Sequence, residues 1–88
     1  MQPEEILILV AKGDKNAFGQ LYALFKDKVY NTSISYLQQD NDAEEITQDV
    51  FVEVYHNAGT YKGGASVSTW IYRITVIKCL DRIRYNNR

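Results

Sequence analysis

The sequence predicts an all-α protein, a compact bundle of about four helices. Apolar residues recur at helical spacing in long segments, and these segments are separated by short polar or glycine-containing breaks. Helix-capping residues stand at several of the expected starts. With 88 residues and 45% hydrophobic content, the chain suffices for one small domain, and an enclosed active-site cleft would be hard to build.

The first helix is expected to run from Pro3 to about Lys12. Proline suits the first turn of a helix, and the acidic pair Glu4 and Glu5 is favourable near a helix N-terminus. Gly13 is expected to end this helix.

A second helix is expected from Asp14, its N-cap, to about Leu37. Its apolar residues follow the i, i+3, i+4, i+7 and i+11 pattern of a single helical stripe. Packing in the core is a better explanation for the aromatic members than stacking on nucleobases. The stripe consists of Phe18, Leu21, Tyr22, Phe25 and Val29.

A third helix is expected after the polar residues 38–41. Asp42 is predicted to cap it, with Glu45 at the capping-box position three residues later. Its apolar stripe consists of Ala43, Ile46, Val50 and Val54, with Phe51 at the edge.

The third helix also carries an acidic stripe, formed by Asp42, Glu45, Asp49 and Glu53. Helical spacing places these four carboxylates within roughly 80° of arc. Such a face is most often simply solvated. The functional interpretation is a docking surface for a basic partner.

A glycine-rich loop is expected at residues 58–66, with three glycines within six residues. Glycine permits positive φ and close backbone approach, and Tyr61 and Lys62 place an aromatic ring beside a cation. These groups suit an unstacked base, although the loop in isolation favours an ordinary helix connection. The loop matches no P-loop, because no G-K-[ST] follows it.

A fourth helix of about five turns is expected to begin after Ser66 or Ser68. Its apolar residues suggest two opposite stripes, and therefore more than one neighbouring element. The first stripe contains Val67, Trp70, Ile71, Ile74 and Ile77, and the second contains Tyr72, Val76, Cys79 and Ile83. Between the stripes lie four basic residues, Arg73, Lys78, Arg82 and Arg84. A DNA phosphate would be a suitable anion for these side chains.

Charge is divided unevenly along the chain. Residues 1–57 carry ten acidic and four basic residues, a net charge of −6, whereas residues 58–88 carry one acidic and six basic residues, a net charge of +5. The asymmetry indicates either two partners of opposite charge, one of them nucleic acid, or attraction between the two halves within the fold.

Several classes of function are disfavoured by the residues present. His56 is the only histidine and Cys79 the only cysteine, so nucleophilic catalysis and a zinc site lack the residues they need. Residues 40–44 resemble the start of an EF-hand, but Glu45 and Phe51 occupy the positions of its glycine and bidentate glutamate. We therefore expect no enzyme activity, metal or cofactor. A lone cysteine and an acidic N-terminus favour a cytoplasmic protein with no membrane partner.

Five segments in order resemble region 2 of an extracytoplasmic-function sigma factor, a bacterial transcription initiation factor. They are A-K-G-D-K-N-A-F-G-Q-L-Y (11–22), V-Y (29–30), D-A-E-E-I-T-Q-D-V-F (42–51), Y-K-G-G-A-S-V-S-T-W-I-Y-R-I (61–74) and C-L-D-R-I-R (79–84). The resemblance covers nearly the whole chain and implies a small all-α bundle over residues 1–88. The family normally continues into a second helical domain that reads the −35 element, which we expect to be absent from this chain.

The resemblance implies docking on RNA polymerase. In the family, the segment that matches residues 42–51 binds the clamp helices of the largest catalytic subunit. The implied contacts are Asp42, Glu45, Gln48, Asp49, Phe51 and Glu53. The charges would contribute mainly orientation and association rate, while Phe51 or neighbouring apolar groups would supply desolvated area. An anti-sigma factor is a further partner that the resemblance implies.

The resemblance also implies recognition and melting of the −10 promoter element on the non-template strand. Tyr61, Lys62, Gly64, Ala65 and Ser66 would shape a pocket for a flipped base. Trp70 would anchor the base of the loop in the core or, as the alternative, act as an exposed wedge. The four basic residues Arg73, Lys78, Arg82 and Arg84 would hold phosphates.

One residue departs from the family pattern, and two other functions compete. Ile77 stands where many members carry asparagine, whose hydrogen bonds isoleucine cannot make.

A helical interaction module without DNA recognition would retain the acidic stripe, but the net charge of +5 on residues 58–88 argues against it. A helix-turn-helix repressor fits less well, because the nine residues of the loop exceed the usual turn of three or four.

Overall fold

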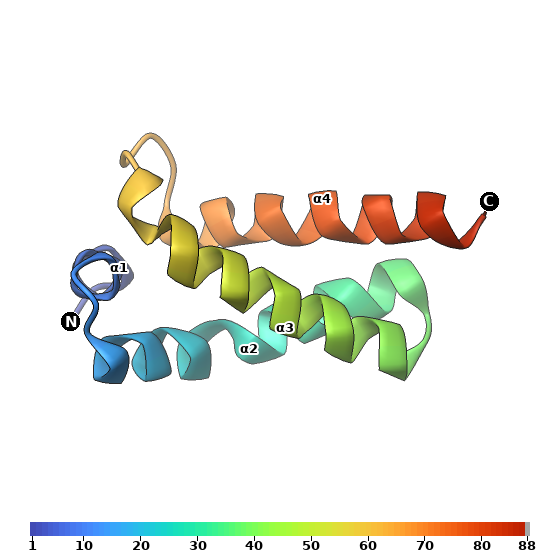
Figure 1. The fold of residues 1–88 in the computed structure, drawn as a ribbon, viewed down its shortest axis with the longest axis horizontal. Helices are drawn as coiled ribbons and strands as arrows, with labels where there is room; N and C mark the ends of the chain where they lie inside the picture. Colours follow the sequence, from blue (N-terminus) through green and yellow to red (C-terminus); the bar gives the residue numbers. More distant parts are fainter. Residues whose placement is uncertain (88) are drawn as a thin grey trace.

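The computed structural model describes residues 1–87, which form four α-helices and one short 3₁₀ helix (Figure 1). The elements are α1 (Pro3–Ala11), α2 (Lys15–Leu37), α3 (Asp40–Asn57), η1 (Ala58–Thr60) and α4 (Val67–Asn86). The predicted all-α bundle of four helices is therefore confirmed. Arg88, which contributes to the charge of the C-terminal half, lies outside the described residues.

The three long helices pack on one another, and α1 closes one end of the bundle (Figure 1). α3 crosses in front of α2 and α4 in this view and contacts both, while α1 is seen nearly end-on beside the start of α2. The domain measures 39 × 22 × 18 Å. No helix within residues 1–87 has the length and apolar character needed to cross a membrane.

The core is built from one buried stripe on each helix, as the periodicity predicts for α2 and α3. In α2, Leu21, Phe25 and Val29 are buried, whereas Phe18 is half-buried and Tyr22 is exposed. Three small polar residues also lie in the core, and each hydroxyl donates to the carbonyl four residues earlier. These bonds are Ser33 to Val29 (2.8 Å), Thr47 to Ala43 (2.7 Å) and Thr75 to Ile71 (2.8 Å). Each buried hydroxyl thereby donates its hydrogen within its own helix.

The start of α3 differs from the prediction. Gln38 adopts the left-handed conformation (φ 58°) and ends α2, so only two residues separate the helices and α3 begins at Asp40 after Gln39 as N-cap. Asp42 therefore lies inside the first turn, and its predicted role as N-cap, with Glu45 completing a capping box, is wrong. The cap of α2 was predicted correctly, since the Asp14 carboxylate accepts from the Ala17 amide at 3.0 Å.

The two apolar stripes predicted on α4 are also wrong. The buried face follows a single row at four-residue spacing, formed by Val67, Ile71, Thr75 and Cys79. Ile77 is 59% exposed and Tyr72 is 52% exposed, although each was placed on a buried stripe. The sequence pattern misled because the threonine in the buried row looks polar, whereas its hydroxyl is satisfied within the helix.

Candidate nucleic-acid and protein interfaces

The glycine-rich loop is closed by Tyr61. The Tyr61 hydroxyl donates to the carbonyl of Ala65, and its ring packs edge-to-face on Trp70 with 5.6 Å between centroids. Both aromatic residues are half-buried and pack against the core. Gly63 has φ +81°, a conformation that other residues rarely adopt. Tyr61 thus fixes the shape of the loop, while Lys62, Gly63 and Gly64 are exposed at its tip.

Two side chains hold the junction between the loop and α4. The Ser66 hydroxyl accepts from the amide of Thr69 at 3.1 Å, which confirms Ser66 as the N-cap and rules out Ser68. The Glu4 carboxylate of α1 accepts from the Val67 amide at 3.4 Å, where a negative charge is favourable at a helix N-terminus. The Glu4 contact could not be predicted from local sequence, because 63 residues separate the two partners.

The four basic residues of α4 form two groups, according to whether their side chains reach α3. Arg73 and Arg84 are exposed, and Arg84 pairs with Asp81 on the same helix. Lys78 instead reaches α3 and pairs with Glu53 at 3.0 Å. Arg82 also reaches α3, as described next. The predicted phosphate contacts at Lys78, Arg82 and Arg84 therefore start from side chains that already have carboxylate partners, whereas Arg73 takes part in none of the ion pairs within residues 1–87.

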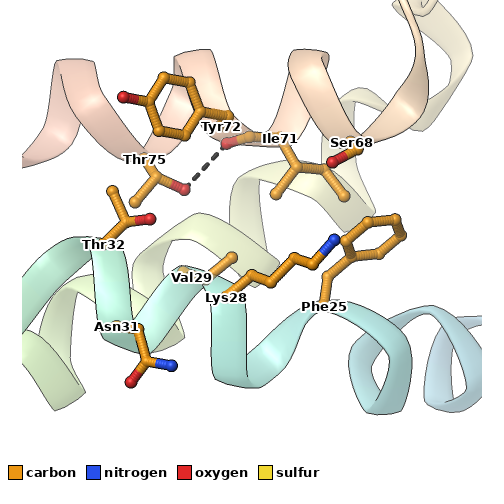
Figure 2. A pocket seen from close by; sticks show the side chains of 9 residues that line it. All are labelled: Phe25, Lys28, Val29, Asn31, Thr32, Ser68, Ile71, Tyr72 and Thr75. Atoms are coloured by element: carbon orange, nitrogen blue, oxygen red, sulfur yellow. Dashed lines mark hydrogen bonds between the residues drawn. The ribbon is translucent and has the colours of Figure 1, made fainter.

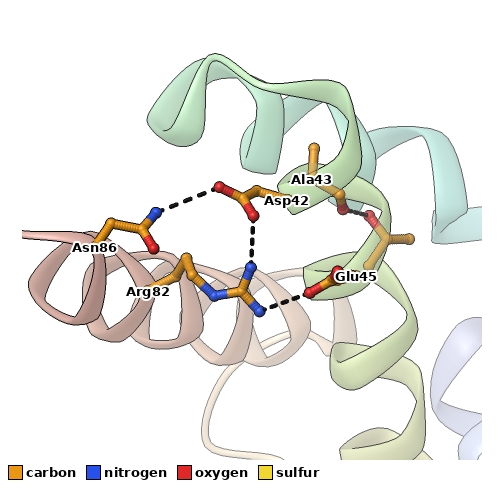
Figure 3. A network of polar contacts seen from close by, with 6 residues as sticks. Asp42, Ala43, Glu45, Arg82 and Asn86 are labelled. Carbon is orange, nitrogen blue, oxygen red and sulfur yellow. Dashed lines mark hydrogen bonds and ion pairs between the residues drawn. The ribbon is translucent and has the colours of Figure 1, made fainter.

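Arg82 lies between two carboxylates of the acidic stripe (Figure 3). Its guanidinium donates to Asp42 at 2.8 Å and to Glu45 at 3.1 Å, and Asn86 donates to Asp42 at 3.3 Å. Burial acts to lower the pKa of Arg82, but the hydrogen bonds and charges of Glu45 and Asp42 outweigh it, so the pKa rises above its ordinary value. The attraction between the two halves, which the charge pattern left open, is thus present in the fold.

Asp49 differs from the other three acids of the stripe. It is exposed, and among residues 1–87 it takes part in none of the ion pairs. Gln48 beside it is exposed as well. These two side chains are therefore the members of the predicted polymerase surface that face solvent without an ionic partner in the described part of the chain.

Next to Gln48 an aromatic groove of about 630 Å³ lies between α2 and α3. It is lined by Lys15, Phe18, Tyr22, Gln48, Phe51, Val52, Tyr55 and His56. Phe51, only 3% exposed, lies beneath Tyr22 with 4.9 Å between ring centroids, and Phe18 meets Tyr55 at 5.2 Å. The sequence prediction included Gln48 and Phe51 but missed Val52 and Tyr55. Their spacing of four and seven residues from Gln48 was the available signal.

No cluster of His, Cys, Asp and Glu residues that could hold a metal ion occurs within residues 1–87. Cys79 is buried, as expected, and burial raises the pKa of its thiol, although a hydrogen bond with Ser33 acts in the opposite direction. A neutral, inaccessible thiol has a packing role.

Comparison with known proteins identifies the fold. The family described as sigma-70 region 2 matches residues 21–88. The chain is 37% identical over 75 residues to the ECF RNA polymerase sigma factor SigW of Bacillus subtilis, covering 85% of this chain and 40% of SigW. It is 32% identical over 80 residues to the ECF sigma factor SigM of Mycobacterium tuberculosis, covering 91% of this chain and 41% of SigM. The chain thus spans about two fifths of the length of these relatives.

Two solved structures are similar over most of the chain. An engineered region 2 of sigmaE in complex with GTAAAA matches with a TM-score of 0.90 and 25% identity, covering 100% of this chain and 92% of that one. CnrH in complex with the cytosolic domain of CnrY matches with a TM-score of 0.81 and 26% identity, covering 89% and 51%. The family match and these relatives agree with the five sequence segments, so this chain belongs to the sigma-70 region 2 family and is a region 2 of the ECF sigma factor type.

Proposed function

We propose that this domain is a bacterial transcription initiation module that docks on the clamp helices of RNA polymerase and recognises and melts the −10 promoter element. The observation that carries the proposal is the match over the whole chain to a sigmaE region 2 in complex with GTAAAA. The curated relatives, which are RNA polymerase sigma factors, support the same function.

The loop is suited to the DNA part of this function. Its tip exposes Lys62 and two glycines, while Tyr61 and Trp70 hold its base. Backbone amides without Cβ cover can approach a base edge closely, and Lys62 can hold the adjacent phosphate. Unstacking a base costs a few kcal/mol, which stacking and hydrogen bonds in a preformed pocket can offset. The exposed Arg73 and Arg84 would add sequence-independent affinity.

The exposed face of α3 is suited to the polymerase part. Gln48 lines the aromatic groove and Asp49 is its exposed neighbour in the chain, so a basic helical partner could meet both a carboxylate and a large apolar area. Asp42, Glu45 and Glu53 already pair with Arg82 or Lys78, so a basic partner would have to share or displace these ion pairs. CnrH is in complex with the cytosolic domain of CnrY, and this supports proposing an anti-sigma factor as a further protein partner.

The alternative is a polymerase-binding module without DNA recognition. The ion pairs of Lys78 and Arg82 with α3 favour it, because they occupy two of the bases predicted to hold phosphates. This alternative retains the docking face and assigns no ligand to the loop.

Fluorescence anisotropy tests both functions with labelled single-stranded DNA containing GTAAAA, a scrambled strand of the same composition, and a polymerase clamp-helix fragment. We expect the domain to prefer GTAAAA over the scrambled strand, to bind it more tightly when the fragment is present, and to lose affinity as salt rises. Binding to the fragment together with equal, weak binding of the two strands would support the alternative. Absence of binding to the fragment would contradict the docking assignment.

The loop itself is tested by comparing Tyr61→Phe with Tyr61→Ala. The phenylalanine variant keeps the ring on Trp70 and removes only the hydrogen bond to Ala65, so binding to GTAAAA should weaken about fivefold, from the roughly 1 kcal/mol of one hydrogen bond. The alanine variant also removes the ring and should lose more than tenfold. Affinity for the clamp-helix fragment should be unchanged in both. Unaltered binding of GTAAAA by Tyr61→Ala would refute the assignment of the loop.

A further inference from the structure

A second groove lies between α2 and α4, and no residue of α3 lines it (Figure 2). Its volume is about 290 Å³. Figure 2 shows Phe25 and Ser68 at one end and Thr32 and Tyr72 at the other, with the Lys28 side chain extended along the α2 side. The sequence pattern predicted only packing for Phe25, Val29, Ile71 and Tyr72, and a candidate helix cap at Ser68.

The groove has an apolar floor and a polar rim. The floor is formed by Phe25, Val29 and Ile71, which are all buried. The rim carries the exposed Lys28, Ser68 and Tyr72, together with the half-buried Thr32. Its lining contains one cation and no carboxylate, although the domain as a whole carries a net charge of −1. This combination of an apolar floor, an aromatic ring, hydroxyls and a cation suits one planar heterocycle that is attached to a phosphate.

The groove begins where the glycine-rich loop ends. Ser68 follows the N-cap Ser66 by two residues, and Tyr72 lies one turn farther along the same side of α4. Four residues of helix advance about 6 Å, so a strand that leaves the loop along α4 meets the groove within one turn. Lys78 and Arg82, by contrast, lie on the side of α4 that faces α3.

We propose that the α2–α4 groove is a second base subsite, which takes an unstacked base of the same single strand next to the position held by the loop. The base would lie over Phe25 and Ile71 and against the ring of Tyr72. Hydroxyls of Ser68 and Thr32 would meet its edge, and Lys28 would hold a phosphate. A volume near 300 Å³ lies at the lower limit of ligand sites and accommodates one base rather than a longer segment. The inference rests on the proposed recognition of single-stranded DNA.

The test combines protein variants with abasic positions in the GTAAAA strand, measured by anisotropy. Tyr72→Ala removes an exposed ring, and Thr32→Trp fills the groove. Tyr85→Ala is the matched control, because Tyr85 is an exposed tyrosine on the same helix that does not line the groove. Base stacking on an aromatic ring contributes about 1–3 kcal/mol, so Tyr72→Ala should weaken binding of the intact strand at least fivefold and the control should not.

The abasic strands then distinguish this subsite from the loop. One abasic position should weaken binding by the unaltered domain but have no further effect on Tyr72→Ala or Thr32→Trp. A different abasic position should weaken binding by the unaltered domain but have no further effect on binding by Tyr61→Ala. If a position depends on Tyr61 but none depends on Tyr72 or Thr32, the second subsite is refuted while the proposed function stands. If the unaltered domain binds no strand at all, both fail.

Discussion

Replacing Leu21 with alanine is expected to lower the free energy of unfolding by about 3–5 kcal/mol. Leu21 is 0% exposed and lies in the middle of the buried stripe of α2, the helix that packs against each of the other three. Truncation removes the transfer free energy of three buried carbons and leaves a cavity that the surrounding helices cannot fully close. A domain of this size has a total stability of about 4–13 kcal/mol, so this loss is a large fraction of it.

Urea denaturation followed by circular dichroism measures this effect, with Leu24→Ala as the matched control. Leu24 lies on the same helix but is 53% exposed, so its truncation should change stability by no more than about 0.5 kcal/mol. In a thermal melt, the Leu21 variant should unfold about 12–40 °C below the unaltered domain. Similar losses for the two variants would mean that the burial assigned to α2 is wrong.

The features of the fold that follow from local sequence were predictable. The stripes of α2 and α3 and the caps at Asp14 and Ser66 depend on residues within a few turns of one another. The start of α3 was missed because Gln38 adopts a left-handed conformation that is uncommon for residues other than glycine. The single buried row of α4 was missed because Thr75 satisfies its hydroxyl on its own helix.

The arrangement of the predicted site residues could not be derived from spacing. The acidic stripe was identified correctly as a set of residues, but its contacts with Arg82 join positions 37 and 40 residues apart and depend on how α3 and α4 are packed. The two grooves likewise arise between α2 and its neighbours, so no single helix indicates them. The assignments of these residues to polymerase and DNA remain predictions.

The ion pairs change how a test of polymerase docking must be designed. Reversing the charge of Glu45 would remove a predicted contact and also place a cation beside Arg82. Reduced binding by that variant could then arise from altered packing of α3 against α4. Asp49 lies one turn farther along the stripe and has no such connection in residues 1–87. Its reversal breaks no ion pair of the described residues, but Asp49 shares a surface hollow with Lys78 and Arg82, so stability has to be measured beside binding.

Asp49→Lys is expected to weaken binding to the polymerase clamp-helix fragment by about tenfold to a hundredfold, because it sets a cation against a basic partner. Its thermal stability should match that of the unaltered domain.

Glu45→Arg should weaken binding comparably and also cost up to about 1 kcal/mol of stability, as expected for an exposed pair. Adding Arg82→Glu to Glu45→Arg restores an ion pair with reversed polarity, and adding Asp42→Asn removes the carboxylate that would then repel the new glutamate. This triple variant should recover stability without recovering binding, because the docking face still carries a cation at position 45. Recovery of binding together with stability would instead show that the acidic stripe serves the packing of α4, and full binding by Asp49→Lys would remove α3 from the polymerase interface.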